Sequence, residues 1–247
     1  SPGDDLRRLD WRALFRFDRL LLREFETETD RSIEFVVDAS RSMSYKGKHP
    51  ESKYGYAALL ASALARLAVA GGDPIGLALL GSELPPVRSA RGIEGVERMI
   101  TTFEREELQN DVASDAARMR KSLEWLFYRQ RRGTLCFFFS DLLDLPPGAI
   151  DLAARLATGG RRLIVVQILD PDEVEFPFQD AAVLRAMEGN VERQITGKDD
   201  GDAYRAALQR LQEEWRMKLS SKTSALVVAT TAEEPIVAAR RILRAIR

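Results

Sequence analysis

The chain has 247 residues, of which 45% are hydrophobic, so it is long enough to bury one sizeable core. Thirty-seven basic and 38 acidic residues leave a formal net charge of −1, which gives no support to a surface for nucleic acid or anionic membranes. The single cysteine, Cys136, excludes an internal disulfide and a cysteine-based zinc site. Its apolar neighbours predict a buried, inert thiol.

No segment reaches the length of about 18 continuous apolar residues that a membrane-spanning helix needs. The amino terminus contains no hydrophobic signal core. We therefore expect a cytoplasmic protein, or one that is anchored to a membrane through a segment missing from this chain.

Residues 1–30 are dense in Arg, Asp, Glu, Leu and Phe and predict an amino-terminal extension, a helix and an extended segment, that packs on the rest of the protein. From residue 31 onward, short apolar runs alternate with stretches whose apolar residues have helical spacing. The predicted strands lie at 33–38, 75–80, 134–140, 162–169 and 224–229, with a weaker one at 84–88. The predicted helices lie at 54–70, 115–130, 203–219 and 234–246. This alternation predicts an α/β fold with a doubly wound, mostly parallel sheet of Rossmann-like type.

One later stretch breaks the alternation. The sequence VLRAMEGNVERQI at 183–195 is typical of two short strands around a Glu-Gly-Asn turn, which indicates an inserted β-hairpin. Because the sequence contains no internal repeat, low-complexity tract or long linker, we interpret residues 31–247 as one domain that carries this hairpin.

The first predicted strand ends at an aspartate that is followed by serines at alternate positions, in the sequence EFVVDASRSMS. Open α/β sheets bind their ligands at the carboxyl ends of the strands. A tight loop there can point alternate side chains to one place, so Asp38, Ser40 and Ser42 offer one carboxylate and two hydroxyls to the same ion. Mg²⁺ takes about six oxygen ligands in proteins, and these three groups would supply half of them.

The other ligands are expected from other strand ends. Asp141 follows the strand-like run FFFS, and Ser114 stands just before a predicted helix in NDVASDAAR. Since all five side chains offer only oxygen, the set favours Mg²⁺ or Mn²⁺ over zinc.

The pattern D-x-S-x-S in one loop, a hydroxyl residue in a second and an aspartate in a third resembles the metal-ion-dependent adhesion site of the von Willebrand factor A domain superfamily. Further stretches of the chain are, in order, PGDDLRRLDWRA, LLREFETETDRSIEFVVDASRSM, SKYGYAALLASALARLAVAGGDPIGL, FSDLLD and DPDEVEFP. On these stretches the sequence resembles, over essentially the whole chain, a bacterial family of von Willebrand A-like proteins, the domain-of-unknown-function family fifty-eight.

The resemblance implies that Asp38, Ser40, Ser42 and Asp141 bind a metal ion. Ser114 departs from the usual pattern, in which a threonine precedes an aspartate, but it keeps the hydroxyl group. The resemblance also implies an association with MoxR-type AAA+ ATPases, which are chaperone-like assembly factors.

These observations predict a non-enzymatic, metal-dependent protein-binding module, an adaptor that works with a MoxR-type ATPase in protein assembly or complex maturation. Two carboxylates and three neutral hydroxyls leave a divalent ion incompletely neutralised, with one coordination position open. A carboxylate of a partner protein can fill that position.

Other interpretations remain open. Asp38, Ser40 and Ser42 can form a turn whose side chains cap the following backbone, in which case the domain is a metal-free structural one. Ser114 can serve as a helix cap. A phosphotransferase of haloacid-dehalogenase type also places aspartates at strand ends. Such an enzyme needs a second acid where Ser40 stands, and no lysine in an evident motif accompanies it.

Overall fold

The structure of the protein is a computed structural model. The residues that it describes are 32–106, 108, 120–124, 126, 128, 131–143, 145–176, 182–185, 192–195, 198–219, 221 and 223–246, with the backbone alone for 182–185, 192–195 and 198–200.

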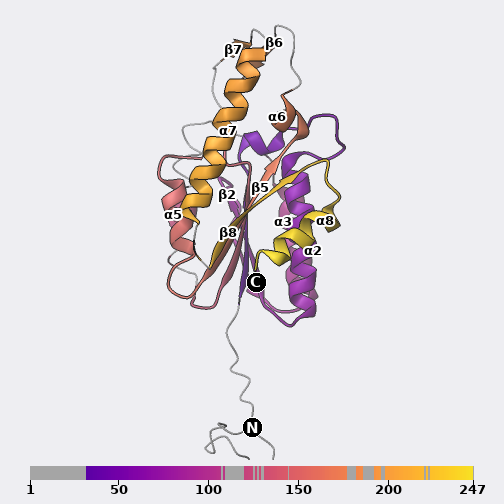
Figure 1. Cartoon of the computed structure of the whole chain (residues 1–247). Helices are drawn as coiled ribbons and strands as arrows, with labels where there is room; N and C mark the ends of the chain where they lie inside the picture. The colour runs from indigo at the N-terminus through magenta and orange to yellow at the C-terminus, as the bar shows by residue number, and fades with distance from the viewer. Residues whose placement is uncertain are drawn as a thin grey trace, which may run out of the picture.

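A six-stranded sheet with the strand order β3-β2-β1-β4-β5-β8 lies at the centre of the molecule (Figure 1). Its strands are β1 (Ile33–Asp38), β2 (Ile75–Leu80), β3 (Val87–Ala90), β4 (Leu135–Ser140), β5 (Arg162–Leu169) and β8 (Ser224–Thr230). The pair β2 and β3 is antiparallel, and the other neighbouring pairs are parallel. The prediction of an α/β fold with a mostly parallel sheet is therefore confirmed.

Helices cover both faces of this sheet (Figure 1). The helices are α2 (Lys53–Ala70), α3 (Ile93–Arg105) and α8 (Pro235–Arg244) on one face, and α5 (Ala149–Leu156) and α7 (Lys198–Lys218) on the other. Two short helices follow strands at the carboxyl edge of the sheet, the 3-10 helix η2 (Arg41–Ser44) after β1 and α6 (Pro171–Glu175) after β5. Within the described ranges, no helix combines the length and the apolar character needed to cross a membrane.

The central strands are buried on both faces, as their continuous apolar sequences predict. Phe35 and Val37 of β1 lie in the core beneath α2, whereas Val36 lies in the core on the α5 side. The Phe35 ring stacks on Phe137 of β4 with 5.4 Å between the centroids. Cys136 is fully buried, as expected of an inert thiol.

Helix α3 is absent from the sequence-based prediction because Gly92 stands just before it and Gly95 interrupts its apolar pattern. In the structure, a Cβ atom on Gly95 would lie 3.3 Å from Ile75 Cγ1 and from the carbonyl oxygen of Ala90, which is a tight contact with the strands below. The residue that argues against a helix therefore allows α3 to lie close against the edge of the sheet. Helix α5 begins within the stretch PPGAID at 146–151, where the sequence indicates a helix start, and its eight residues span only about two turns.

The edge strand β3 lies at 87–90 and not at 84–88, because Pro85 and Pro86 have no amide hydrogen to donate to a strand partner. The hairpin is confirmed, with β6 (Ala182–Arg185) antiparallel to β7 (Glu192–Ile195). Helix α7 begins at Lys198, five residues before the predicted start. The amino-terminal extension at 1–30 lies outside the described residues, as does part of the helix expected at 115–130.

The strand order places a topological switch point between β1 and β4. The chain leaves β1 toward β2 on one side, and its next strand in the parallel part of the sheet, β4, lies on the other side of β1. Ligands of open α/β sheets bind at the carboxyl ends of the strands at such a point. Asp38 ends β1 and Asp141 follows β4, so both candidate carboxylates stand there.

Candidate metal centre

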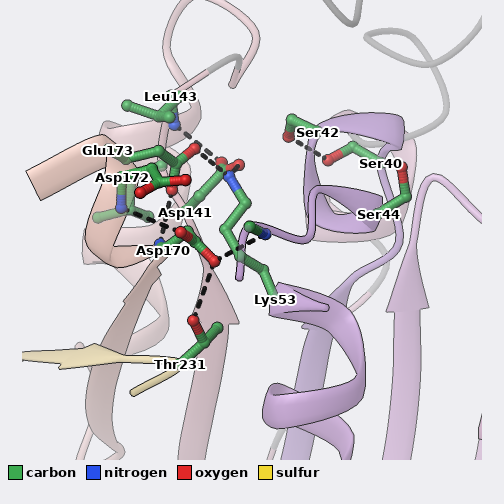
Figure 2. A network of polar contacts seen from close by, with 12 residues as sticks. Ser40, Ser42, Ser44, Lys53, Asp141, Leu143, Asp170, Asp172, Glu173 and Thr231 are labelled. Atoms are coloured by element: carbon green, nitrogen blue, oxygen red, sulfur yellow. Dashed lines mark hydrogen bonds and ion pairs between the residues drawn. The ribbon is translucent and has the colours of Figure 1, made fainter. Parts of the chain in front are cut away.

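The loop after β1 holds three of the predicted ligands in one buried turn. Asp38, Ser40 and Ser42 are exposed by only 1%, 4% and 5%. The backbone amide of Ser40 donates to Asp38 Oδ1 over 2.9 Å, which closes the turn. The capping interpretation is thus correct for one oxygen of Asp38. It does not describe Ser40, whose hydroxyl makes no capping bond to η2 and instead lies 3.1 Å from the hydroxyl of Ser42 (Figure 2).

The second oxygen of Asp38 faces β4. The hydroxyl of Ser140 donates to Asp38 Oδ2 over 2.6 Å. Among the described residues, no lysine, arginine or histidine pairs with the Asp38 carboxylate, although it is almost completely buried. Burial, and then the nearby charge of Asp141, raise the pKa of Asp38 to about 6, against the bonds from Ser140 and Ser40. Asp38 is thus a buried acid at the switch point that has no counter-charge among the described side chains.

Asp141 lies in the loop that follows β4 and is 1% exposed. Its Oδ1 accepts the backbone amide of Leu143 over 3.0 Å, and its Oδ2 accepts the ammonium of Lys53 over 2.7 Å (Figure 2). Its backbone carbonyl accepts Nε2 of the fully buried Gln167 over 2.9 Å. Each side-chain oxygen of Asp141 therefore has a partner, as in Asp38, but Asp141 also has a cation beside it, which Asp38 does not have among the described residues.

Lys53 is the residue of this centre that sequence reasoning missed. It is 1% exposed, and its ammonium also contacts Glu173 Oε1 at 2.5 Å. Burial alone would lower the pKa of Lys53, but the two carboxylates outweigh it and the pKa is raised. A signal was available, because Lys53 is the first residue of α2, where the helix dipole disfavours a cation. A lysine at that position indicates a compensating negative charge nearby.

Asp170 joins three loops around the same edge of the sheet. It is fully buried and accepts bonds from the Gly47 amide, the Thr231 hydroxyl and the Asp172 amide, each at 3.0–3.1 Å (Figure 2). The Asp170 amide in turn donates to Glu173 Oε2 over 2.8 Å, which completes a capping box for α6. A polar network therefore runs from the loop after β1 to the ends of β4, β5 and β8.

Of the five predicted ligands, the structure brings Asp38, Ser40, Ser42 and Asp141 to the carboxyl ends of β1 and β4, whereas Ser114 lies outside the described residues. In the described part of the chain, no cluster of three or more His, Cys, Asp or Glu side chains could hold a metal ion. A metal here would depend on hydroxyl donors. Asp38 and the Ser40 and Ser42 hydroxyls fit this role, since all three offer oxygen atoms and the buried charge of Asp38 is not compensated by any described side chain.

Comparison with known proteins gives the family. The family model described as "Protein of unknown function DUF58" matches residues 1–218. The uncharacterized protein Rv1480 of Mycobacterium tuberculosis (strain ATCC 25618 / H37Rv) is 26% identical over 199 residues, which are 79% of this chain and 61% of the relative. The uncharacterized protein Mb1516 of Mycobacterium bovis matches with the same figures. The chain thus spans less than two thirds of the length of these relatives.

Solved structures similar to this chain include von Willebrand factor A proteins. The conserved hypothetical protein BatB from Bacteroides thetaiotaomicron matches with a TM-score of 0.48 and 13% identity, over 87% of this chain and 98% of that chain. A von Willebrand factor type A protein from Catenulispora acidiphila matches with a TM-score of 0.46 and 10% identity, over 87% of this chain and 41% of that chain.

Proposed function

The chain belongs to the DUF58 family of proteins of unknown function, and we propose that it is a non-enzymatic module that binds Mg²⁺ or Mn²⁺ and, through the ion, an acidic side chain of a partner protein. Asp38, Ser40 and Ser42 hold the ion in this proposal. Asp141 supports it from the neighbouring strand end, and Ser114 is the proposed hydroxyl of the third loop.

The observation that carries the proposal is the buried Asp38 carboxylate. It is 1% exposed, its pKa is raised to about 6, and no side-chain cation of the described residues neutralises it. Burying a charge without a partner is costly, so proteins pair such groups or use them to coordinate metals. The two hydroxyls beside Asp38 are neutral oxygen donors, which is the kind of ligand that Mg²⁺ accepts together with a carboxylate.

The charges of the donors favour an acidic partner. Ser40 and Ser42 are neutral, and the charge of Asp141 is shared with Lys53. An ion at Asp38 would therefore keep a net positive charge at the carboxyl edge of the sheet. A carboxylate of another protein supplies the missing negative charge and one more oxygen ligand.

The alternative of a phosphotransferase gains one element from the structure, a buried lysine at the site. This lysine, Lys53, pairs with Asp141 and Glu173 and makes no bond to Asp38, the position of the nucleophile in that mechanism. Ser40 still occupies the place of the proton-donating acid, and a serine hydroxyl does not have a suitable pKa for that role. These features support a binding function over a catalytic one.

The first candidate partner is a MoxR-type AAA+ ATPase, on the basis of the family resemblance. The chain would act as an adaptor that joins this ATPase to its targets in protein assembly or complex maturation. An ATPase partner requires the domain to face the cytoplasm, where ATP is available.

The proposal is tested by titrating the protein against the purified MoxR-type ATPase of the same host, using interferometry in Mg²⁺ and in EDTA. We expect binding by the wild type in Mg²⁺ only, and no binding by Asp38→Ala in either buffer. Calorimetry with Mg²⁺ and Mn²⁺ separates the two parts of the proposal. Equal affinity of wild type and Asp38→Ala for the ATPase in both buffers, or no metal binding at millimolar concentration, would overturn it.

A further inference from the structure

Lys53 occupies a position from which it can control the charge of the candidate metal centre. Its ammonium lies 2.7 Å from Asp141 Oδ2 and 2.5 Å from Glu173 Oε1, and 88 and 120 residues of chain separate it from these partners. The Lys53 nitrogen also lies over the Tyr45 ring, 5.8 Å from its centroid. The ammonium is thus fixed between two carboxylates, one of which is a predicted metal ligand (Figure 2).

The contacts of Lys53 give the two aspartates of the site different electrostatic surroundings. Asp141 is compensated by a cation of the protein, whereas Asp38 is not compensated by any described side chain. Glu173 is 15% exposed and contacts the same ammonium. The negative charge of Glu173 therefore affects how strongly Lys53 neutralises Asp141.

We propose that Lys53 is a built-in counter-cation that sets the divalent-ion affinity of the centre, with Glu173 adjusting how strongly Lys53 neutralises Asp141. This inference rests on the proposed function and deepens it. It makes Lys53 and Glu173 positioning residues, because neither is a ligand of the ion in the proposed site. The lysine limits the attraction of the centre for the ion and leaves the bound ion more positive toward an acidic partner.

Two substitutions should change the affinity in opposite directions. Lys53→Met removes a positive charge near the ion and leaves Asp141 uncompensated, so divalent ions should bind more tightly. Glu173→Gln removes a negative charge and leaves the ammonium to Asp141 alone, so they should bind less tightly. For charges a few ångströms apart at an effective dielectric constant of about 20–80, each substitution should change the dissociation constant of the divalent ion by about tenfold or more.

The experiment measures the dissociation constant of Mn²⁺ by calorimetry for wild type, Lys53→Met, Glu173→Gln and the control Lys48→Met. Lys48 is an exposed lysine in the same loop region, so its removal should change the affinity by less than about twofold. Unfolding temperatures in EDTA and in Mn²⁺ give a second readout. A purely structural Lys53 would lower both temperatures equally, whereas a counter-cation makes the stabilisation by Mn²⁺ larger in Lys53→Met than in wild type.

The outcomes separate this inference from the proposed function. If the wild type binds the metal and the three variants bind it with the same affinity, the proposed role of Lys53 is overturned and the proposed function stands. Binding by Lys53→Met but not by wild type means that the ammonium takes the place of the ion, which supports the counter-cation and overturns the function. No binding by any variant overturns both. If Lys53→Met does not fold, Glu173→Gln decides: weaker binding supports the inference, and unchanged binding overturns it.

Discussion

The hydroxyl of Ser140 donates a 2.6 Å hydrogen bond to Asp38 Oδ2, across the neighbouring strands β4 and β1. Ser140 is fully buried and therefore holds the carboxylate in one orientation. This bond lowers the pKa of Asp38 and so opposes the effect of burial. Ser140 thus keeps Asp38 ionised, and an ionised carboxylate is the form that binds a cation.

We predict that Ser140→Ala raises the pKa of Asp38 above about 6 and weakens Mn²⁺ binding at pH 7 by roughly five- to 150-fold, since one lost bond to a charged group is worth about 1–3 kcal/mol. Calorimetric titrations between pH 6 and pH 8.5 would show the affinity curve displaced to higher pH. Ser44→Ala is the control, because among the described residues the Ser44 hydroxyl bonds the Arg41 carbonyl within η2 and no group of Asp38. An unchanged pH profile in Ser140→Ala would contradict the prediction.

Gly47 allows the closest approach of the loop after β1 to Asp170. A Cβ atom at this position would clash with Asp170 Oδ1, so Gly47→Ala cannot be accommodated without moving the loop or the carboxylate. We expect a loss of about 1–3 kcal/mol of unfolding free energy, the cost of leaving a buried acceptor unsatisfied, and weaker Mn²⁺ binding. Urea unfolding and calorimetry measure the two effects.

The matched control is Gly55→Ala in α2. Its Cβ atom would come closest to the end of the Glu51 side chain, at 2.9 Å, and that side chain is exposed and free to move aside. Because alanine favours the helix over glycine by about 1 kcal/mol, this variant should be as stable as the wild type or more stable. Equal destabilisation by both substitutions would show that the close contact between Gly47 and Asp170 has no special role.

Gln167 and Gln212 connect α7 to the Asp141 loop. Gln212 Nε2 donates to Gln167 Oε1 over 2.8 Å, and Gln167 Nε2 donates to the Asp141 carbonyl. Gln167→Leu leaves this carbonyl and the Gln212 amide without these bonds, and we expect a loss of about 1–3 kcal/mol. In a double-mutant cycle with Gln212→Leu, the second substitution should cost less in the Gln167→Leu background. Strict additivity in urea unfolding would argue against the connection.

The parts of the fold and site that could be predicted depend on local sequence. The strand 33–38 and the D-x-S-x-S loop were predictable because a buried parallel strand has a continuous apolar sequence and its carboxyl end is a fixed place in the sheet. Lys53 was not predicted, because its partners Asp141 and Glu173 are distant in sequence and only the fold brings them together. The role of Asp170 likewise depends on Gly47 and Thr231, which lie in other loops.

The charge of Asp38 makes the stability of the metal-free protein depend on pH in an unusual direction. The pKa of Asp38 is about 6 in the folded protein, whereas the ordinary pKa of an aspartate side chain in water is 3.8. Between these two values the folded state binds more protons than the unfolded state, so this group stabilises the fold as the pH falls and destabilises it as the pH rises. Above about pH 6, the buried Asp38 is ionised and the loss of unfolding free energy is complete. At about 1.4 kcal/mol per unit of pKa, this loss is roughly 1–3 kcal/mol.

We therefore predict that Asp38→Asn, which removes the charge and keeps the size, is more stable than the wild type in EDTA at pH 7.5, by up to about 3 kcal/mol. The difference should fall to about a third of this value at about pH 4.5 and approach zero only below about pH 3.8, where Asp38 is protonated in the unfolded state as well as in the folded state. Saturating Mg²⁺ should reverse the order at pH 7.5, since only the wild type binds the ion and gains stability from it. Urea unfolding of both proteins at three pH values, with EDTA and with Mg²⁺, measures all of these differences. A wild type that is more stable than Asp38→Asn in EDTA at pH 7.5 would mean that Asp38 already has a counter-charge, and the case for a metal at this position would fall.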